Sequence, residues 1–282
     1  MKREDFAIFI LSYGRANNIY TLNSLKDSNY TGKYYIVVGD DDPTINEYKR
    51  LYKDNLLIFS KKEIGKTFDL CDMGGSDKVI VYARNYCFKI AKELGLKYFA
   101  QFDDDYTSFE YRYDNGEKLK IMKSKEFDEI INIFIDFLED TGAMTVAFGQ
   151  GGDFIGGKES QLFKSKIKRK AMNSFFCKTD SPFQFFGRIN EDVNMYTHYG
   201  SIGKKIFTVA DCSLVQKQTQ KNKGGMSDTY NQNGTYVKSF YTVMTNPSCT
   251  KIFAMDTTHT RIHHKVNWNC AVPKIISDKY KK

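Results

Sequence analysis

The sequence contains few prolines, a single tryptophan and four histidines, and none of its six cysteines forms a C-x-x-C pair. A zinc cluster needs closely spaced ligands on a turn. The cysteines are scattered, at Cys71, Cys87, Cys177, Cys212, Cys249 and Cys270. We therefore interpret them as reduced thiols rather than as a zinc site or a secreted disulfide framework.

Long apolar runs are also missing. The first one, Phe6–Leu11, is far shorter than the roughly 20 residues that cross a bilayer, and a charged segment precedes it where a signal peptide would stand. We therefore expect a cytoplasmic protein with no membrane partner. A hydrophobic content of 41% and a charged content of 27% are those of a globular protein, and 282 residues suffice for one large domain or two closely packed ones.

The charge balance is basic, with a formal net charge of +8. Solubility alone explains such a value, and so does a polyanionic partner. Clustered cations favour the second alternative, because they bind a phosphate backbone through counterion release. These cations are Lys164, Lys166, Lys168, Arg169 and Lys170, followed by Lys217, Lys221 and Lys223.

Short apolar runs indicate strands that are buried on both faces, as in a parallel sheet. They are Phe6–Ser12, Tyr34–Gly39, Leu56–Ser60 and Tyr98–Phe102. Asn17–Leu25 can form a helix between the first two runs, and Val81–Leu94 has helical spacing with Gly95 as a stop. A further helix begins at Ser124 and ends at Gly142. This alternation predicts an α/β fold with an open, Rossmann-like sheet.

Polar residues follow three of these predicted strands. They are Ser12–Arg15, Asp40–Asp42 and Asp103–Asp105. Ligands of open α/β sheets bind outside the carboxyl ends of the strands, so we expect the three segments to meet at one rim. After about residue 145 the sequence turns irregular and rich in Gly, Asn, Gln and aromatic residues, which is typical of loops that carry binding and catalysis.

The aspartates Asp103, Asp104 and Asp105 are the strongest candidates for a metal site. Carboxylates this close repel one another, and a compensating cation keeps them ionised. Asp103 and Asp105, separated by one residue, can reach one Mg²⁺ or Mn²⁺ together and leave positions open for substrate phosphates. A solvated acidic turn is the alternative, but the buried strand before the acids favours the metal.

Three further residues near this rim are candidates for donor binding. Arg84, in the YARN segment that opens the long helix, can bind phosphate at a helix N-terminus, and Arg15 could do likewise. Asp40 stands where an acid commonly binds a ribose hydroxyl or the edge of a nucleobase. A surface arginine and an acidic turn remain the alternatives for each residue taken alone.

Two later motifs carry titratable pairs. Glu191 and Asp192, in GRINEDVNMY, could take the proton from an acceptor hydroxyl, since an acid near another acid has a raised pKa; a capped helix start is the alternative. His263 and His264 lie in RIHHKVNWN. Neighbours on a strand point to opposite faces, so at most one of them easily reaches the metal.

Taken in order, SYGR, DDD, the YARN helix, the second DDD, NED and a late histidine resemble the GT-A class of glycosyltransferases. Within that class, the later segments resemble the TET-associated glycosyltransferases, phage proteins thought to add sugars to hydroxymethylated pyrimidines in DNA. These segments are Gln150–Gly157, Arg169–Cys177, Pro182–Asn194, Thr219–Met226, Gly234–Tyr241 and Arg261–Lys274.

The resemblance implies a GT-A-like fold with a mixed, mainly parallel sheet flanked by helices, in one domain over 1–282. Residues 1–110 would form the nucleotide-sugar half, and 111–282 the acceptor-binding and catalytic half. The implied metal ligands are Asp103, Asp105 and one or both of His263 and His264. Ser12, Tyr13, Arg15, Asp40, Arg84 and Asp104 would bind the donor, Asp192 would be the general base beside Glu191, and Lys166, Lys168, Arg169 and Lys170 would contact DNA.

The implied function is that of a metal-dependent, hexosyltransferase-type enzyme. It would transfer sugar from a nucleotide sugar, such as a UDP-sugar, to 5-hydroxymethylcytosine or a related base in phage DNA, in the cytoplasm of the host cell. A direct attack assisted by Asp192 would invert the anomeric centre. The alternatives are a protein or glycan acceptor, metal-dependent nucleotidyl transfer, and DNA binding without catalysis.

Overall fold

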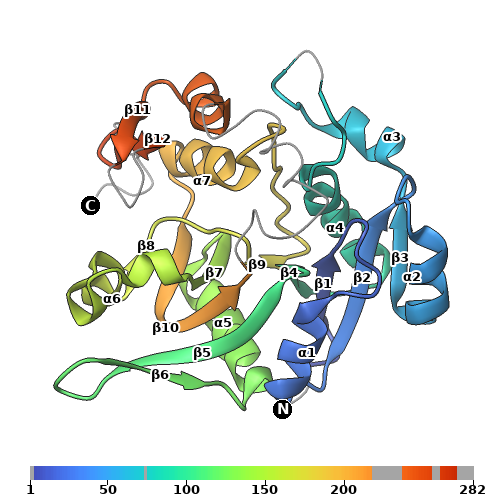
Figure 1. The fold of residues 1–282 in the computed structure, drawn as a ribbon, viewed down its shortest axis with the longest axis horizontal. Coiled ribbons are helices and arrows are strands. Elements are labelled where there is room, and N and C mark those ends of the chain that lie inside the picture. Colours follow the sequence, from blue (N-terminus) through green and yellow to red (C-terminus); the bar gives the residue numbers. More distant parts are fainter. Residues whose placement is uncertain (1–2, 73–74, 218–236, 256–260, 272–282) are drawn as a thin grey trace.

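A computed structural model of the chain describes residues 3–72, 75–217, 237–255 and 261–271. Its centre is a ten-stranded sheet in the order β3-β2-β1-β4-β9-β7-β10-β5-β6, with β8 paired to β10 (Figure 1). The strands are β1 (Phe6–Leu11), β2 (Lys33–Gly39), β3 (Leu56–Phe59), β4 (Tyr98–Asp103), β5 (Tyr106–Asp114), β6 (Leu119–Lys123), β7 (Thr145–Gly149), β8 (Ile167–Lys168), β9 (Phe175–Lys178) and β10 (Ile206–Gln216). A separate two-stranded sheet pairs β11 (Thr250–Met255) with β12 (Arg261–Val266).

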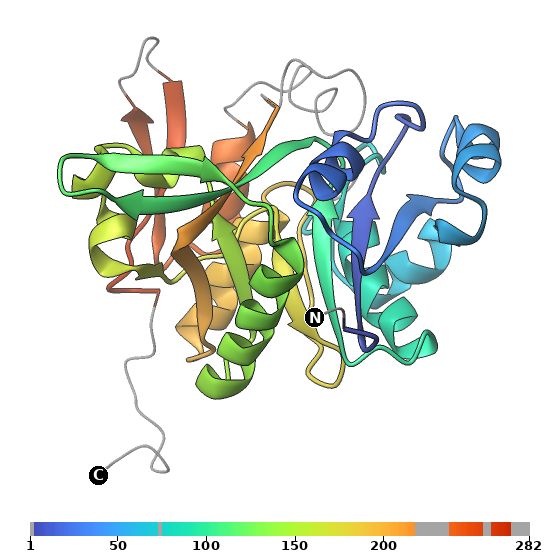
Figure 2. The ribbon, with the colours of Figure 1, turned by 90° about the horizontal axis from the view of Figure 1, so that it is seen from below.

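Helices cover both faces of the large sheet (Figure 2). The α-helices are α1 (Tyr20–Asp27), α2 (Ile45–Tyr52), α3 (Lys61–Ile64), α4 (Val81–Glu93), α5 (Phe127–Thr141), α6 (Gln161–Ser165) and α7 (Glu191–Ser201), and a further helix spans 237–245. Short 3₁₀ helices are η1 (Lys53–Asn55), η2 (Gly65–Thr67), η3 (Gly151–Phe154) and η4 (Gly157–Glu159). Among the described residues no helix has both the length and the apolar character of a membrane span.

Apolar side chains point to both faces of the sheet from β1, which explains why the sheet has a core on each face. Phe6, Ile8 and Ile10 pack on one side with residues of α1 and α5, while Phe9 and Leu11 pack on the other with residues of α4 and α7. Successive side chains of a strand point to opposite faces, so a strand that is apolar throughout must be covered twice. The α/β fold predicted from these runs, with a mixed central sheet flanked by helices, is confirmed and is consistent with a Rossmann-like fold.

The first half of the sheet is parallel, because β1 pairs in parallel with β2 and β4, and β2 with β3. Beyond β4 the sheet becomes mixed: β9 runs antiparallel between β4 and β7, while β7 and β10 are parallel. The carboxyl ends of β1, β2 and β4 therefore lie at one edge of the sheet. In open α/β sheets, ligands bind at this edge.

Two predicted helix starts need correction. The helix expected from Asn17 begins at Tyr20, and the helix expected from Ser124 begins at Phe127. The predicted ends are closer, since Gly142 caps α5 with φ 59°, and α4 ends at Glu93 with Gly95 in a left-handed conformation beyond it. Ser124 instead hydrogen-bonds the backbone of Phe109, where β5 and β6 form a hairpin.

Candidate active site

A cavity of about 780 Å³ lies between the carboxyl-end rim of the sheet and α7. Its lining combines Ser12, Tyr13 and Arg15 after β1, the three aspartates after β4, and residues near the N-terminus of α7. Residues of the C-terminal sheet, including His263 and His264 on β12, also line it. The cavity thus brings together the predicted catalytic and metal-binding residues and all of the predicted donor-binding residues except Asp40.

Asp104 is held from two sides by residues that follow β1. Its Oδ2 accepts a hydrogen bond of 2.6 Å from Ser12 Oγ, and its Oδ1 forms an ion pair of 2.8 Å with Arg15 Nη1. Tyr48 Oη lies 2.7 Å from Ser12 Oγ and accepts a bond from the amide of Arg15. Asp104 is 4% exposed. Its contacts with Ser12 and Arg15 fix the loop after β1. Its predicted contact with the donor stays a prediction.

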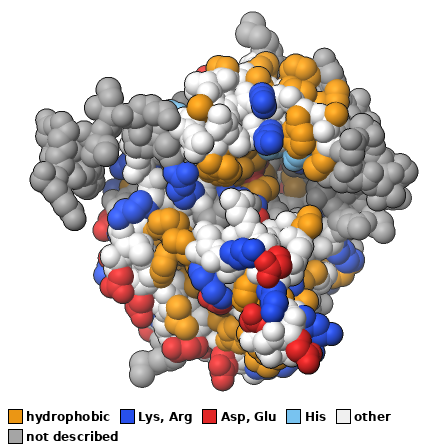
Figure 3. Space-filling view, turned by 90° about the vertical axis from the view of Figure 1, so that its left-hand side faces the viewer, with side chains coloured by type: hydrophobic (Ala, Val, Ile, Leu, Met, Phe, Trp, Pro, Cys, Tyr) orange, Lys and Arg blue, Asp and Glu red, His pale blue; other side chains and the backbone are white. Residues whose placement is uncertain are grey.

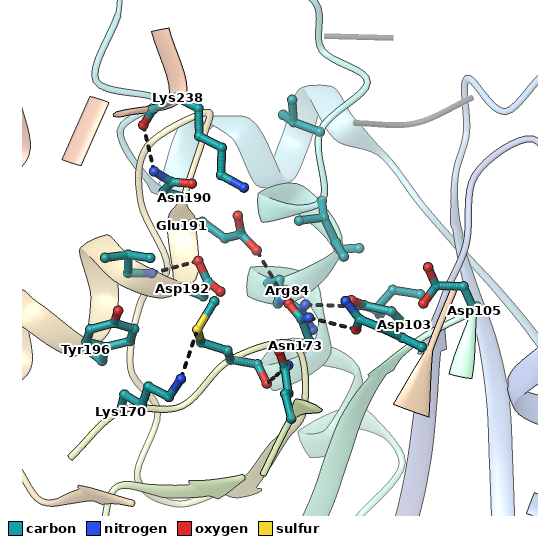
Figure 4. Close-up of a pocket in the computed structure, with 18 of the residues that line it drawn as sticks. Arg84, Asp103, Asp105, Lys170, Asn173, Asn190, Glu191, Asp192, Tyr196 and Lys238 are labelled. Atoms are coloured by element: carbon teal, nitrogen blue, oxygen red, sulfur yellow. Dashed lines mark hydrogen bonds and ion pairs between the residues drawn. The ribbon is translucent and has the colours of Figure 1, made fainter. Parts of the chain in front are cut away.

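Arg84 is the buried counter-ion of the site (Figure 4). Its Nη2 donates to Asp103 Oδ1 at 2.8 Å, and its Nε lies 3.5 Å from Glu191 Oε1. The guanidinium also lies over the ring of Phe175, 4.7 Å from its centroid. Arg84 lies one turn inside α4, and its charge is directed at protein carboxylates. Its predicted binding of the donor remains untested.

Burial and mutual repulsion raise the pKa values of the acids at the end of β4. Burial raises the pKa of Asp103 to about 6, although Arg84 opposes this change. Burial, followed by the charges of Asp103 and Asp104, raises the pKa of Asp105 to about 7. Asp105 Oδ1 is buried and has no hydrogen-bond partner among the described residues. The negative charge of this carboxylate is thus poorly compensated by the protein, so a bound cation would stabilise it.

Glu191 and Asp192 form the first turn of α7, and each is 7% exposed. Burial and the charge of Asp192 raise the pKa of Glu191 to about 7, and burial also raises the pKa of Asp192. Asn190, before them, has φ 56° and donates to the carbonyl of Lys238 at 2.8 Å. Asn85 forms two hydrogen bonds with the backbone of Phe185, which fixes the loop leading into this helix. These contacts fix the start of α7, and both acids line the cavity.

The acidic segment after β2 has mixed roles. Asp42 is buried and accepts hydrogen bonds from the amides of Gly14 and Thr44, which fixes the turn. Asp40 is exposed, accepts from the amide of Lys61 at 3.2 Å, and is absent from the cavity lining. Its predicted contact with the donor stays a prediction. Tyr13 does line the cavity, and the Lys61 ammonium lies 4.8 Å from its ring centroid.

His263 and His264 both line the cavity, with ring centroids 4.5 Å apart. Burial lowers the pKa of His264 to about 4, so its imidazole is neutral near pH 7. Within the described part of the chain, however, no three histidine, cysteine or acidic side chains form a group able to hold a metal ion. The histidines and aspartates predicted as metal ligands do not converge in this way, and a shared site stays a prediction.

The predicted DNA-binding cations are spread over different surroundings. Lys170 lines the cavity and pairs with buried Asp153 at 2.5 Å, whereas Lys166 is exposed and pairs with Asp211. Arg169 lies over the ring of Trp268 at 5.9 Å. The backbone of Lys168 belongs to β8, but its side chain is outside the described structure, as are Lys221 and Lys223 altogether.

Tyr196 and Lys238 are cavity residues that were not singled out from the sequence. Tyr196, on α7, stacks on Trp268 with ring centroids 5.7 Å apart, and Lys238 meets Asn190 near the start of that helix. Tyr196 lies four residues after Asp192, a spacing that places both on one face of a helix. That spacing was the available signal for Tyr196; the sequence holds none for Lys238, which reaches the site through tertiary packing.

Comparison with protein families agrees with this site. The family model described as TET-Associated Glycosyltransferase matches residues 6–225, and this match contains Asp103, Asp105, Glu191 and Asp192. The chain belongs to the TET-associated glycosyltransferase family. A member of this family is a glycosyltransferase, and that reaction implies a nucleotide-sugar donor and an acceptor. No curated protein sequence matches the chain.

Proposed function

We propose that this glycosyltransferase moves a sugar from a nucleotide sugar, such as a UDP-sugar, to a hydroxymethylated pyrimidine in DNA, such as 5-hydroxymethylcytosine. The observation that carries the proposal is the buried pair Glu191–Asp192, which faces the same cavity as Asp103 and Asp105. Arg84 lies between the two acid pairs and contacts one member of each. A donor bound near Asp103 and Asp105 can therefore meet an acceptor bound near Glu191 and Asp192.

The donor would bind at the rim formed by the first 110 residues. Tyr13 and Arg15 line this end of the cavity, and the Asp104 contacts hold Arg15 in place. The carboxyl ends of parallel strands are the usual place for a nucleotide in open α/β sheets. Ser12, which binds Asp104, would then act by fixing the loop that carries Tyr13 and Arg15.

The acids of this rim fit a divalent cation, Mn²⁺ or Mg²⁺. The buried Oδ1 of Asp105, which has no hydrogen-bond partner in the part of the chain that the structure describes, favours such a charge. Ions of this kind are commonly bound by one or two carboxylates together with substrate phosphates. Asp105 and Asp103 would hold the metal with the donor's diphosphate. When bound, it would stabilise the negative charge that develops on the leaving nucleoside diphosphate.

Asp192 would act as the general base. Its carboxylate would take the proton of the acceptor hydroxymethyl group, and the oxygen would bond to the anomeric carbon of the sugar as the bond to the diphosphate breaks. Burial raises the pKa of Asp192, which makes the carboxylate a better proton acceptor near neutral pH. A single displacement of this kind inverts the anomeric centre.

The acceptor would bind in the half formed by residues 111–282. Lys166, Lys168, Arg169 and Lys170 are the proposed phosphate contacts, supported by the net charge of +8. We further propose that the enzyme acts in the cytoplasm, that of a bacterial host if a phage encodes it.

The test is a screen of hydroxymethylated DNA against a panel of nucleotide sugars with Mn²⁺ or Mg²⁺, read by mass spectrometry of the nucleosides. The expected result is a hexosylated hydroxymethylpyrimidine nucleoside together with nucleoside diphosphate. Release of pyrophosphate would indicate nucleotidyl transfer instead. Turnover on a protein or glycan, with unmodified DNA, would assign a different acceptor and overturn the proposal.

A further inference from the structure

The cavity extends beyond the part of the chain that the family model matches. The match ends at residue 225, but Phe253, His263, His264, Lys265 and Trp268 also line the cavity. These five residues, here called the C-terminal wall, come from β11, β12 and the turn that follows. Residues within the family match therefore form one part of the cavity lining, and the C-terminal wall forms another.

The C-terminal wall is aromatic and carries positive charge. Phe253 and His263 lie with ring centroids 5.9 Å apart, and Trp268 stacks on Tyr196 at an interplanar angle of 21°. Cations lie over these rings, with Lys265 5.9 Å from the ring centroid of Phe253 and Arg169 at the same distance from that of Trp268. Flat rings with adjacent cations suit a planar nucleobase joined to a phosphate.

The wall also offers hydrogen bonding. The Nδ1 atom of His264 is buried without a hydrogen-bond partner among the described residues. An unpartnered polar atom inside a cavity costs free energy that a ligand can recover by binding to it. The edge of a nucleobase carries donors and acceptors of the required kind.

The wall lies within reach of the proposed general base. Asp192 and Tyr196 are four residues apart on α7, so their side chains are neighbours, with about 5–6 Å between Cβ atoms in such pairs. Trp268 stacks on Tyr196. In Figure 4, Asp192 lies between Tyr196 on one side and the Arg84–Asp103 pair on the other. A planar group at the wall can thus direct a substituent at Asp192 while the donor occupies the opposite end.

Intact duplex DNA does not suit this arrangement. Asp192 is only 7% exposed, and a double helix is far wider than a cavity of about 780 Å³. Figure 3 shows that the cavity's face of the molecule is hollowed, with hydrophobic side chains inside the hollow and Lys and Arg side chains around it. The backbone of a nucleic acid can follow such a rim while one nucleotide enters.

We propose that the target nucleotide leaves the DNA helix and that its base binds against the C-terminal wall, with the hydroxymethyl group next to Asp192. This inference rests on the proposed function. Phe253 and Trp268 then provide stacking surface, His264 binds the edge of the base, and Arg169 and Lys265 meet the flanking phosphates.

The first test compares acceptors of one sequence. The target 5-hydroxymethylcytosine is placed opposite guanine, opposite adenine as a mismatch, or in a single strand. Extrusion costs least for a mismatched or unpaired base, so kcat/KM should rise by about tenfold or more for the mismatch and remain high for the single strand. Equal or lower kcat/KM for the mismatch, or loss of transfer to the single strand, overturns the inference.

The second test uses the only tryptophan of the chain. Trp268→Ala should raise the KM for DNA by about tenfold, because loss of one stacking surface has an effect of this order, and Trp268→Phe should restore most of it. Ile262→Ala is the matched control, since Ile262 lies on β12, is 36% exposed and does not line the cavity.

These outcomes separate the inference from the proposed function. If the wild-type enzyme transfers no sugar to any DNA, both fall. If it modifies DNA but the mismatch gives no gain, or Trp268→Ala changes the donor KM alone, extrusion against the wall is wrong while the function stands. Should Trp268→Ala fail to fold, the comparison of acceptors with the wild-type enzyme remains decisive.

Discussion

Arg84 and Asp103 form an ion pair of 2.8 Å between α4 and the end of β4, and the Arg84 side chain is 1% exposed. The same guanidinium lies 3.5 Å from Glu191 on α7. One buried cation therefore joins the two groups of acids that we assign to donor and acceptor. Its position makes the site's charge balance depend on the relative placement of three elements.

Replacing Arg84 by methionine should destabilise the protein by about 3–5 kcal/mol, because it leaves buried carboxylates without their counter-ion. The matched control is Lys89→Met on the same helix, where an exposed pair with Glu93 spans 3.9 Å and contributes little. Urea denaturation followed by circular dichroism gives both values. Equal small losses for the two variants would show that Arg84 is not the counter-ion described here.

Asp105→Asn should stabilise the free protein while abolishing transfer. The pKa of Asp105 is raised in the folded protein to about 7, so its stability contribution is present at low pH and is lost as pH rises through this value. The asparagine variant avoids that loss and should gain about 1–3 kcal/mol above pH 7, with little gain near pH 4. Thermal unfolding at both pH values, combined with a transfer assay, measures this. A destabilised but active variant would contradict the role of Asp105.

The pH profile should report the acids on α7. A general base must be ionised. Burial raises the pKa of Asp192 above its ordinary value. Burial and the charge of Asp192 raise the pKa of Glu191 to about 7. We expect kcat/KM to fall as pH drops through the neutral range, as a property of the coupled pair. Glu191→Gln removes a negative neighbour, so the acidic limb should move to lower pH. A limb that stays in place would exclude this coupling.

Much of the fold was predictable, because its signals are local. The run Phe6–Leu11 is apolar at every position, as only a strand covered on both faces needs to be, and Gly142 marks a helix end through its left-handed backbone. The rim was predictable too, since parallel neighbours bring Ser12 and Asp104 together. In contrast, β9 inserts between β4 and β7, a long-range pairing that no local pattern reveals.

The sequence indicated the acids of the candidate site and Arg84, but not the ion pairs between them. The sequence indicated Asp103, Asp105, Glu191 and Asp192 through their context. It did not show that Arg84 pairs with both Asp103 and Glu191, because the second pair joins helices that are far apart in the sequence. Lys170 was predicted as a DNA contact from a run of cations. Its pairing with buried Asp153 depends on how the loop before β9 folds back on η3.

The dependence of DNA binding on salt should identify which cation meets a phosphate. Arg169→Ala should lower the slope of log KM for DNA against log salt by about one, because one released counterion is lost. Lys62→Ala is the control, as Lys62 is exposed on α3, far from β8 (Figure 1). Steady-state kinetics at several salt concentrations provides the slopes. If both variants keep the wild-type slope, Arg169 does not contact the backbone.

The most direct measurement is the mass of nucleosides from 5-hydroxymethylcytosine DNA after incubation with Mn²⁺, UDP-glucose and either the wild-type enzyme or Asp192→Asn. Our account predicts that the wild type adds one hexosyl unit to the modified nucleoside. It also predicts that the variant, which keeps the shape of the side chain but cannot accept the proton, slows the addition by about 10²–10⁴-fold. Undiminished transfer by Asp192→Asn would contradict the account.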